Sequence, residues 1–159
     1  MSDMTKSRPS LGRSIGASIS YRDRPAAMAF LQIAFGFEPA FVLTFEDGSL
    51  GHAEMSFGDG YVIIAGEWPD RGRVSPLAVG GRTTQALFVR LAEGIDAHYE
   101  RARAAGAVIQ AEPVSQPYGD RTYQAVDPEG HIWMFGQAVA DAGGRGPLQT
   151  VSAPGGANG

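Results

Sequence analysis

The sequence contains no cysteine among its 159 residues, and this absence excludes several kinds of chemistry at once. Without thiols the chain forms no disulfide, has no thiolate nucleophile and offers no sulfur ligand of the kind that structural zinc sites use. Histidine is also scarce, with three residues in the whole chain.

Long apolar runs and clusters of basic residues are missing too. No stretch approaches the roughly 20 apolar residues of a membrane-spanning helix, and residues 1–13 lack the apolar core of a signal peptide. The net charge is -4, and no run of five or more basic residues occurs. We therefore expect a cytoplasmic protein that binds neither nucleic acid nor a membrane.

Two common catalytic motifs are absent as well. The chain has no Gly-x-Ser-x-Gly sequence of the kind that presents a serine nucleophile. The pair Gly80-Gly81 precedes a predicted strand, not a helix, so it does not predict a phosphate-binding loop. Neither a serine hydrolase nor a nucleotide-binding enzyme of these types is expected.

Glycine is abundant, with 22 residues, and three pairs of glycines recur at an offset of 70 residues. The pairs are Gly36 with Gly106, Gly60 with Gly130, and Gly66 with Gly136. The first pair ends two helix-like runs, and the other two bracket short apolar runs. The same order of elements therefore occurs twice in the sequence, and this repetition predicts a single domain with an internal repeat.

The residue patterns predict the elements of each copy. In the first copy, strands are expected over 14–21, 41–45, 50–57 and 61–65, with a helix that starts at Asp23-Arg24-Pro25 and ends at Gly36. In the second, strands are expected over 83–91, 108–111, 121–126 and 132–135, with a helix over 95–105. The turn before the last strand, Asp127-Pro128-Glu129-Gly130, has the residues of a type I turn. His98, on the second helix, is expected to face solvent.

These elements define an α+β fold of two β-α-β-β-β modules that form a cupped, mostly antiparallel sheet. Module one covers about 14–67, a linker covers 68–81 and module two covers 82–138, within one domain over 14–138. Residues 1–13 are expected to form a flexible N-terminal arm. Residues 139–159 are rich in glycine and proline and are expected to form a flexible tail.

The second copy carries Tyr118-Gly119-Asp120-Arg121, followed by the sequence Asp-Pro-Glu-Gly-His-Ile-Trp over 127–133. With the repeated order of elements, these motifs resemble the vicinal oxygen chelate superfamily, and most closely its glyoxalase and bleomycin-resistance branch. The resemblance covers roughly 14–138 and implies the cupped fold and a homodimer. It also implies one divalent metal, held by His, Glu or Gln from the first and last strands of each module.

Those four strands contain almost no metal ligand. The resemblance places a ligand near Gly16, Ile64, Gln85 and Met134, and only the amide of Gln85 offers a hard oxygen donor. A displaced metal site built from His52, Glu54 and His131 is an alternative, because His52 and Glu54 share one face of a strand. The other interpretation of His131 is a hydrogen bond that stabilises its own hairpin.

Without a metal, apolar and aromatic side chains are expected to line the cup, with a few polar groups that orient a ligand. The wider set comprises Phe45, Met55, Phe57, Trp68, Phe88, Tyr118, Tyr123, Trp133 and Met134. The residues predicted to bind ligand are Trp68, Tyr118, Arg121, Trp133, Glu54 and Phe57. Arg121 has a second interpretation, as a structural partner of Asp120 or Asp127.

The sequence therefore supports three hypotheses. The first is a metal-independent, dimeric protein that binds a small aromatic or cationic molecule in an apolar cleft. The second is an enzyme, either a metal-dependent lyase or dioxygenase with displaced ligands, or a metal-free catalyst with Glu54 as the general base. The third is a structural or regulatory dimer whose own side chains fill the cleft.

Overall fold

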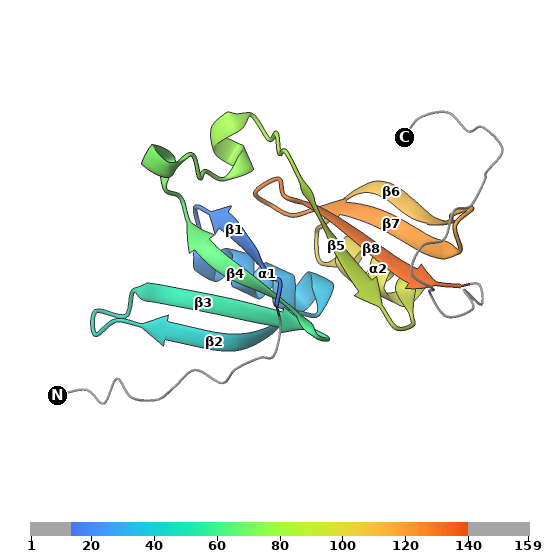
Figure 1. The fold of residues 1–159 in the computed structure, drawn as a ribbon, viewed down its shortest axis with the longest axis horizontal. Helices are drawn as coiled ribbons and strands as arrows, with labels where there is room; N and C mark the ends of the chain where they lie inside the picture. The colour runs from blue at the N-terminus through green and yellow to red at the C-terminus, as the bar shows by residue number, and fades with distance from the viewer. Residues whose placement is uncertain (1–13, 140–159) are drawn as a thin grey trace.

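In the computed structural model, which describes residues 14–139, the first module is built around a four-stranded sheet (Figure 1). The chain forms β1 (Ala17–Tyr21), α1 (Arg24–Phe35), β2 (Glu38–Thr44), β3 (Leu50–Phe57) and β4 (Gly60–Gly66). The strands lie in the order β1-β4-β3-β2, and β1 runs parallel to β4 while the other pairs are antiparallel. The arm and tail predicted for 1–13 and 139–159 lie outside the described residues, apart from Val139.

The second module repeats this arrangement. It contains β5 (Ala86–Leu91), α2 (Ile95–Ala104), β6 (Val108–Ser115), β7 (Asp120–Val126) and β8 (Ile132–Ala138). Its strand order, β5-β8-β7-β6, is that of the first sheet, and β5 runs parallel to β8. The predicted α+β fold of two β-α-β-β-β modules is therefore confirmed. In the part of the chain that the structure describes, no helix is long and apolar enough to cross a membrane.

The first helix forms where the sequence predicts it. The Asp23 carboxylate accepts a hydrogen bond from the Ala26 N–H, 3.0 Å away, and Pro25 lies in the first turn. Ala27, Leu31, Ala34 and Phe35 form the buried face, because residues three and four apart share one side of a helix. Gly36 ends the helix at a φ of 76°, a left-handed conformation that glycine adopts without strain.

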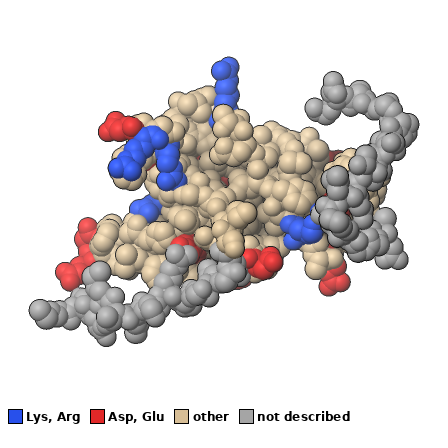
Figure 2. Space-filling view, viewed as in Figure 1, with Lys and Arg blue, Asp and Glu red and all other residues tan. Residues whose placement is uncertain are grey.

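Several strand boundaries differ from the predictions. β1 begins at Ala17 instead of residue 14, β2 begins at Glu38 instead of residue 41, and β8 continues to Ala138 instead of ending at residue 135. The strand predicted over 108–111 continues through Pro113 to Ser115, because β6 pairs with β7 on one side only and needs no N–H from Pro113 on its open edge. The strand predicted from residue 83 begins instead at Ala86. The preceding linker contains two short 3-10 helices, η1 (Pro69–Arg71) and η2 (Pro76–Val79). Figure 2 shows basic side chains over this linker, and all of them are arginines because the linker contains no lysine.

The hydrophobic core lies where α1 packs against α2 and both helices meet the sheets. Aromatic residues from both modules join there, since Phe35 contacts Trp133 and Phe135 at ring distances of 5.4 and 4.9 Å. His98 belongs to this core, and the prediction that it faces solvent is wrong. Its two ring nitrogens lie 2.6 Å from the Tyr123 hydroxyl and 2.9 Å from the Phe35 carbonyl.

A buried polar network joins the modules at the turn before β8. The Asp127 carboxylate accepts hydrogen bonds from the Tyr21 hydroxyl at 2.7 Å and from the Glu129 and His131 N–H groups at 3.0 Å. The His131 ring bonds the Ser20 carbonyl at 2.9 Å, so it links two modules and does not stabilise its own hairpin as predicted. The Asp127 carboxylate holds the turn together instead.

Candidate functional site

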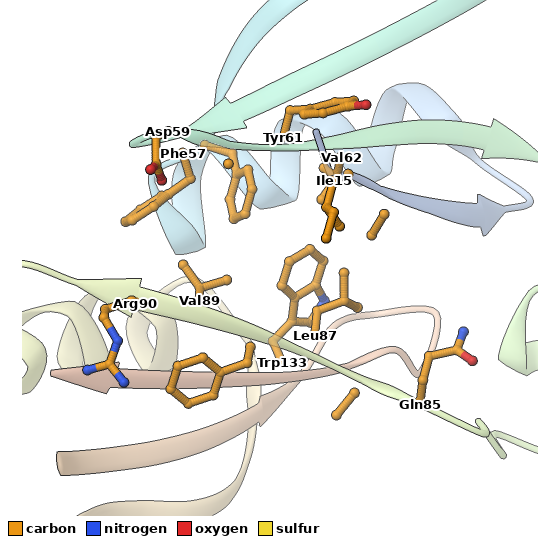
Figure 3. Close-up of a pocket in the computed structure, with 16 residues that line it drawn as sticks. Ile15, Phe57, Asp59, Tyr61, Val62, Gln85, Leu87, Val89, Arg90 and Trp133 are labelled. Carbon is orange, nitrogen blue, oxygen red and sulfur yellow. The ribbon is translucent and has the colours of Figure 1, made fainter. Parts of the chain in front are cut away.

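A cleft of about 640 Å³ lies between the two modules (Figure 3). The residues before and within β1, together with β4, form one wall, and β5 forms the other. Trp133 points from β8 toward Val62 and Ile15 on the opposite wall. The cleft therefore exists only because the two modules lie side by side.

Aromatic side chains from both modules line this cleft. They are Phe37, Phe57, Tyr61, Phe88 and Trp133. Aliphatic groups such as Leu87 and Val89 fill the spaces between the rings. A lining of this kind favours flat, apolar ligands, because aromatic faces stack and exclude water.

A hydrogen bond to Asp127 and a contact with Phe37 fix the position of the Trp133 side chain. Its side chain is fully buried, and its indole N–H donates to the Asp127 carboxylate at 3.0 Å. The ring also contacts Phe37, with ring centres 5.4 Å apart. The same carboxylate that joins the modules therefore orients the aromatic floor of the cleft.

Three polar side chains lie on the lining. Asp59 and Gln85 are exposed, while Arg90 forms a bidentate ion pair with Asp120 at 2.7 and 3.1 Å. The hydrogen bond to Asp120 raises the pKa of Arg90. The Arg90 guanidinium also lies 5.5 Å from the centre of the Phe88 ring. The charge of Arg90 is matched by Asp120, whereas no ion pair among residues 14–139 includes Asp59, so Asp59 carries the unpaired charge of this lining within the described residues.

The Tyr61 ring packs on Gly16 and the Phe88 ring packs on Gly136. Both glycines lie at or near positions where the resemblance places metal ligands. A Cβ atom added to Gly16 would lie 2.3 Å from Cζ of Tyr61, and one added to Gly136 would lie 2.5 Å from Cζ of Phe88. Ile64 faces the core, and Met134 is half-buried opposite Phe88. The residues at these positions do not fit a divalent cation, since no carboxylate or imidazole is among them.

The structure does not assemble the alternative metal site. The His52 ring nitrogen Nε2 lies 2.8 Å from the Glu54 carboxylate, and Glu54 is fully buried on β3. His131 makes its contact with Ser20 instead. Within residues 14–139, no three His, Asp or Glu side chains come together in a way that could hold a metal ion. Neither His52 nor Glu54 lines the cleft.

Of the six residues predicted to bind ligand, Phe57 and Trp133 line the cleft. Trp68 precedes η1, is half-exposed and stacks against the Arg71 guanidinium, 4.1 Å from its ring centre. Tyr118 is exposed in the hairpin between β6 and β7. Arg121 forms an ion pair with Asp96 at 2.8 Å. It therefore has a structural partner, but this partner is neither Asp120 nor Asp127, the two that the sequence suggested.

The wider set of lining candidates likewise contains residues inside the cleft and residues outside it. Phe88 lines the cleft, Met55 and Tyr123 are core residues, and Phe45 is exposed beside a hairpin turn. Sequence reasoning missed Phe37, Tyr61 and Arg90. Tyr61 follows a turn glycine directly, and Arg90 is the one polar residue of β5. These signals place both residues on a sheet, but they do not show that the two sheets face each other.

The chain belongs to the Glyoxalase/Bleomycin resistance protein/Dioxygenase superfamily, whose profile matches residues 16–135. An uncharacterized protein of Mycobacterium bovis is 32% identical over 98 residues, which are 60% of this chain and 63% of that protein. An uncharacterized protein of Mycobacterium tuberculosis is 32% identical over 98 residues, 60% of this chain and 56% of the relative. The match thus spans less than two thirds of either relative.

Solved structures of this superfamily have the same fold. TioX from Micromonospora sp. ML1 has a TM-score of 0.62 and 28% identity, covering 80% of this chain and 97% of TioX. TnmS3, an antibiotic binding protein from Streptomyces sp. CB03234, has a TM-score of 0.60, 19% identity and coverage of 79% and 96%. The fosfomycin resistance protein FosX from Listeria monocytogenes, solved with Mn(II) and sulfate, has a TM-score of 0.60, 16% identity and coverage of 80% and 91%.

Proposed function

We propose that this protein binds a small aromatic or cationic molecule in the cleft between its modules, without a metal ion. The observation that carries this proposal is the convergence of five aromatic rings, from both modules, on one cleft of about 640 Å³, in which Phe57, Tyr61 and Phe88 are partly exposed and Phe37 and Trp133 are buried behind them. Such rings bind planar groups by stacking and cations by their electron-rich faces. TnmS3, which shares the fold, is described as an antibiotic binding protein.

Charge on the lining favours a cation over an anion. Asp59 is a carboxylate at the edge of the cleft, and the positive charge of Arg90 is already paired with Asp120. A planar cation would gain the attraction of Asp59 as well as stacking on the rings. Because Asp59 is exposed, this attraction is screened by salt and contributes less than stacking does.

Metal independence rests on the chemistry of the side chains near the expected ligand positions. Gly16, Ile64 and Met134 offer no hard donor, and the Tyr61 ring occupies the space that a side chain at residue 16 would need. The enzyme alternative depends on His52 and Glu54, which lie outside the cleft lining. The third alternative, a cleft filled by its own side chains, is disfavoured by the volume that remains open.

We also propose a homodimer, as the resemblance to the superfamily implies. Exposed apolar side chains on the outer strands support it, namely Val42 and Leu43 on β2 and Val108 and Val114 on β6. A second copy that covered these strands would remove apolar surface from water. Sedimentation velocity of the full chain at several concentrations tests this: a dimer is expected, and a monomer at every concentration contradicts it.

Calorimetric titration with proflavine, a planar aromatic cation, tests the binding proposal. We expect binding to the full chain, with weaker binding of the neutral planar compound 2-naphthol. Ala86 is exposed and lines the cleft, so Ala86→Trp should obstruct it and weaken proflavine binding by about tenfold or more. The matched control, Ala104→Trp, adds the same ring at an exposed helix position outside the cleft. Equal binding by the two variants would contradict the proposal.

Fluorescence locates the ligand independently. The chain has two tryptophans, so the Trp68→Phe variant reports on Trp133 alone. Proflavine in the cleft should quench this emission, because Trp133 lies on the lining. Quenching that disappears with Trp68 would place the ligand at the linker instead.

A further inference from the structure

A second cleft, of about 580 Å³, lies beside β1 and takes no part in the proposed aromatic site. Its walls come from β1, from the linker around η2, and from the residues that lead into β5. Gln85 lines both clefts, so the two hollows are neighbours. Their linings nevertheless differ in chemistry, because this one carries few aromatic groups and several hydrogen-bond donors.

The lining of this second cleft is cationic and rich in hydroxyl groups. Two arginines, Arg73 and Arg82, approach it from the linker, and Ser18, Thr83 and Thr84 contribute hydroxyls. No carboxylate is among the described residues that line it. In a chain with a net charge of -4, such a grouping of positive charge is a local feature and does not follow from composition.

Neither guanidinium group is paired with a carboxylate among residues 14–139. Other arginines are paired with carboxylates, as Arg90 is with Asp120 and Arg121 with Asp96. Arg73 donates to the Ser18 hydroxyl at 2.5 Å, which holds its guanidinium across the cleft against β1.

We propose that this second cleft binds the phosphate group of a small phosphate monoester. Guanidinium groups present paired N–H donors that match the oxygens of phosphate, and their hydrogen bonds to a dianion are stronger than those between neutral groups. The Ser18 hydroxyl adds a further donor, whereas the Thr83 and Thr84 hydroxyls donate to the Gln85 backbone carbonyl at 3.0 Å and to its side-chain carbonyl at 2.9 Å. A carboxylate ligand would satisfy fewer of these donors, because it has two oxygens where a phosphate group has three free ones.

The proposal predicts a specific pattern in an NMR titration of the full chain with inorganic phosphate and with phenyl phosphate. Both probes should shift the backbone amide resonances of Ser18, Thr83 and Thr84. Arg82→Gln, an exposed residue on the lining, should weaken binding of either probe by about fivefold to tenfold. Arg73→Lys keeps the charge but loses the fork of donors, so its effect should be smaller than that of Arg73→Gln.

Arg71→Gln is the matched control, because Arg71 belongs to the same linker but stacks on Trp68 and does not line the cleft. It should change binding by less than about twofold. Equal weakening by Arg71→Gln and Arg82→Gln, or no shift with either probe, would overturn the proposal. Pelleting with phosphatidic acid vesicles but no response to the soluble probes would also overturn it, in favour of a lipid headgroup.

This inference does not rest on the aromatic cleft. Ala86→Trp, which obstructs that cleft, should leave the binding of inorganic phosphate unchanged, since Ala86 is not part of the second lining. Loss of phosphate binding in Ala86→Trp would contradict the assignment to the Arg73 and Arg82 cleft. Failure of proflavine to bind would count against the proposed function alone.

Discussion

The hydroxyl of Tyr21 donates a hydrogen bond to the Asp127 carboxylate at 2.7 Å, across 106 residues of sequence and from one module to the other. The other oxygen of Asp127 accepts from two backbone N–H groups of its own turn. One buried carboxylate therefore fixes both the local turn and the relation of the two modules. Since the aromatic cleft lies between those modules, its shape depends on this contact.

Asp127→Ala is expected to destabilise the protein by about 3 kcal/mol or more, because it leaves the Tyr21 hydroxyl, the Trp133 indole N–H and two backbone donors without their acceptor. Tyr21→Phe removes one donor and should cost about 1 kcal/mol. Urea denaturation measures both. Asp47→Ala, at an exposed hairpin turn, is the control and should change the midpoint far less. A similar effect of the two aspartate substitutions would contradict the role given to Asp127.

Glu129 makes stability depend on pH in the acid range. Burial raises the pKa of Glu129, but hydrogen bonds from the Arg22 N–H, the Ser75 hydroxyl and the Asp23 N–H outweigh burial and hold the pKa below its ordinary value of 4.5. The unfolded chain therefore takes up this proton first as the pH falls.

The stability that Glu129 contributes should be complete above the unfolded pKa and lost as the pH falls through the folded one. Glu129→Gln should consequently show a smaller loss of unfolding free energy between about pH 5 and pH 3 than the unmodified protein. Urea denaturation at a series of pH values measures this difference. Parallel curves for the two proteins would show that Glu129 does not carry the effect.

His98 should titrate below the ordinary range. Burial lowers the pKa of His98, and although the Phe35 hydrogen bond raises it, the charge of Arg101 lowers it further. The Phe35 carbonyl can only accept, so Nε2 carries the proton and Nδ1 accepts from the Tyr123 hydroxyl. The neutral ring is thus the form that the fold selects, and its contribution to stability is lost as the pH falls below about 6.5.

Tyr123→Phe removes the donor to Nδ1, so the neutral ring loses a partner and the His98 pKa should rise toward its ordinary value. An NMR titration of the His98 ring protons measures this shift. In His98→Gln, the dependence of unfolding free energy on pH between about 7 and 5 should be reduced. An unchanged His98 pKa in Tyr123→Phe would contradict the assigned direction of this hydrogen bond.

The contact between Tyr61 and Gly16 predicts an interaction that a double-mutant cycle can detect. Gly16→Ala should destabilise the protein by about 1–3 kcal/mol, because the new methyl group would overlap the Tyr61 ring. In a Tyr61→Ala background the same substitution should cost much less. Thermal and urea unfolding of the four proteins measure the coupling. Additive effects would show that the ring does not occupy the space above Gly16.

Divalent cations should not stabilise the protein, because Gly16, Ile64 and Met134 provide no hard ligand near the expected positions. Added Zn²⁺ or Mn²⁺ should leave the melting temperature unchanged, since a ligand that binds only the folded state must raise it. Metal analysis of the purified protein is the complementary measurement. A stoichiometric metal that is lost in His52→Ala would support the displaced site and contradict the proposed function.

The element order could be predicted because its signals are local. Asp23 and Gly36 mark the two ends of α1, and alternating apolar residues identify β3 and β7 from neighbours a few residues away. The burial of the His98 ring and its hydrogen-bond partners could not be predicted from such local signals. Its helix carries charged residues on both sides of it, and only the packing of α2 against α1 and against β7 brings Phe35 and Tyr123 to its ring.

In the candidate site, too, some residues could be predicted from local sequence and others depend on tertiary packing. Phe57 and Trp133 could be proposed from the aromatic content of strands expected to line a cup, whereas Tyr61 and Arg90 acquire their roles from residues on other strands. Trp68 and Tyr118 were proposed because aromatic residues in loops are poorly explained by packing. In the structure Arg71 covers the ring of Trp68, and Tyr118 is exposed at a hairpin.

The sequence by itself determined the two modules, their helices and turns, and the scarcity of hard ligands near the expected metal positions, where only Gln85 offers one. These properties depend on residue types and on spacings within a few turns or strands. Only the tertiary structure decided which rings share a cleft, that Asp127 joins the modules, and that Arg73 and Arg82 line a second hollow. Those outcomes depend on how two sheets pack, and packing is set by contacts between residues that are far apart in the chain.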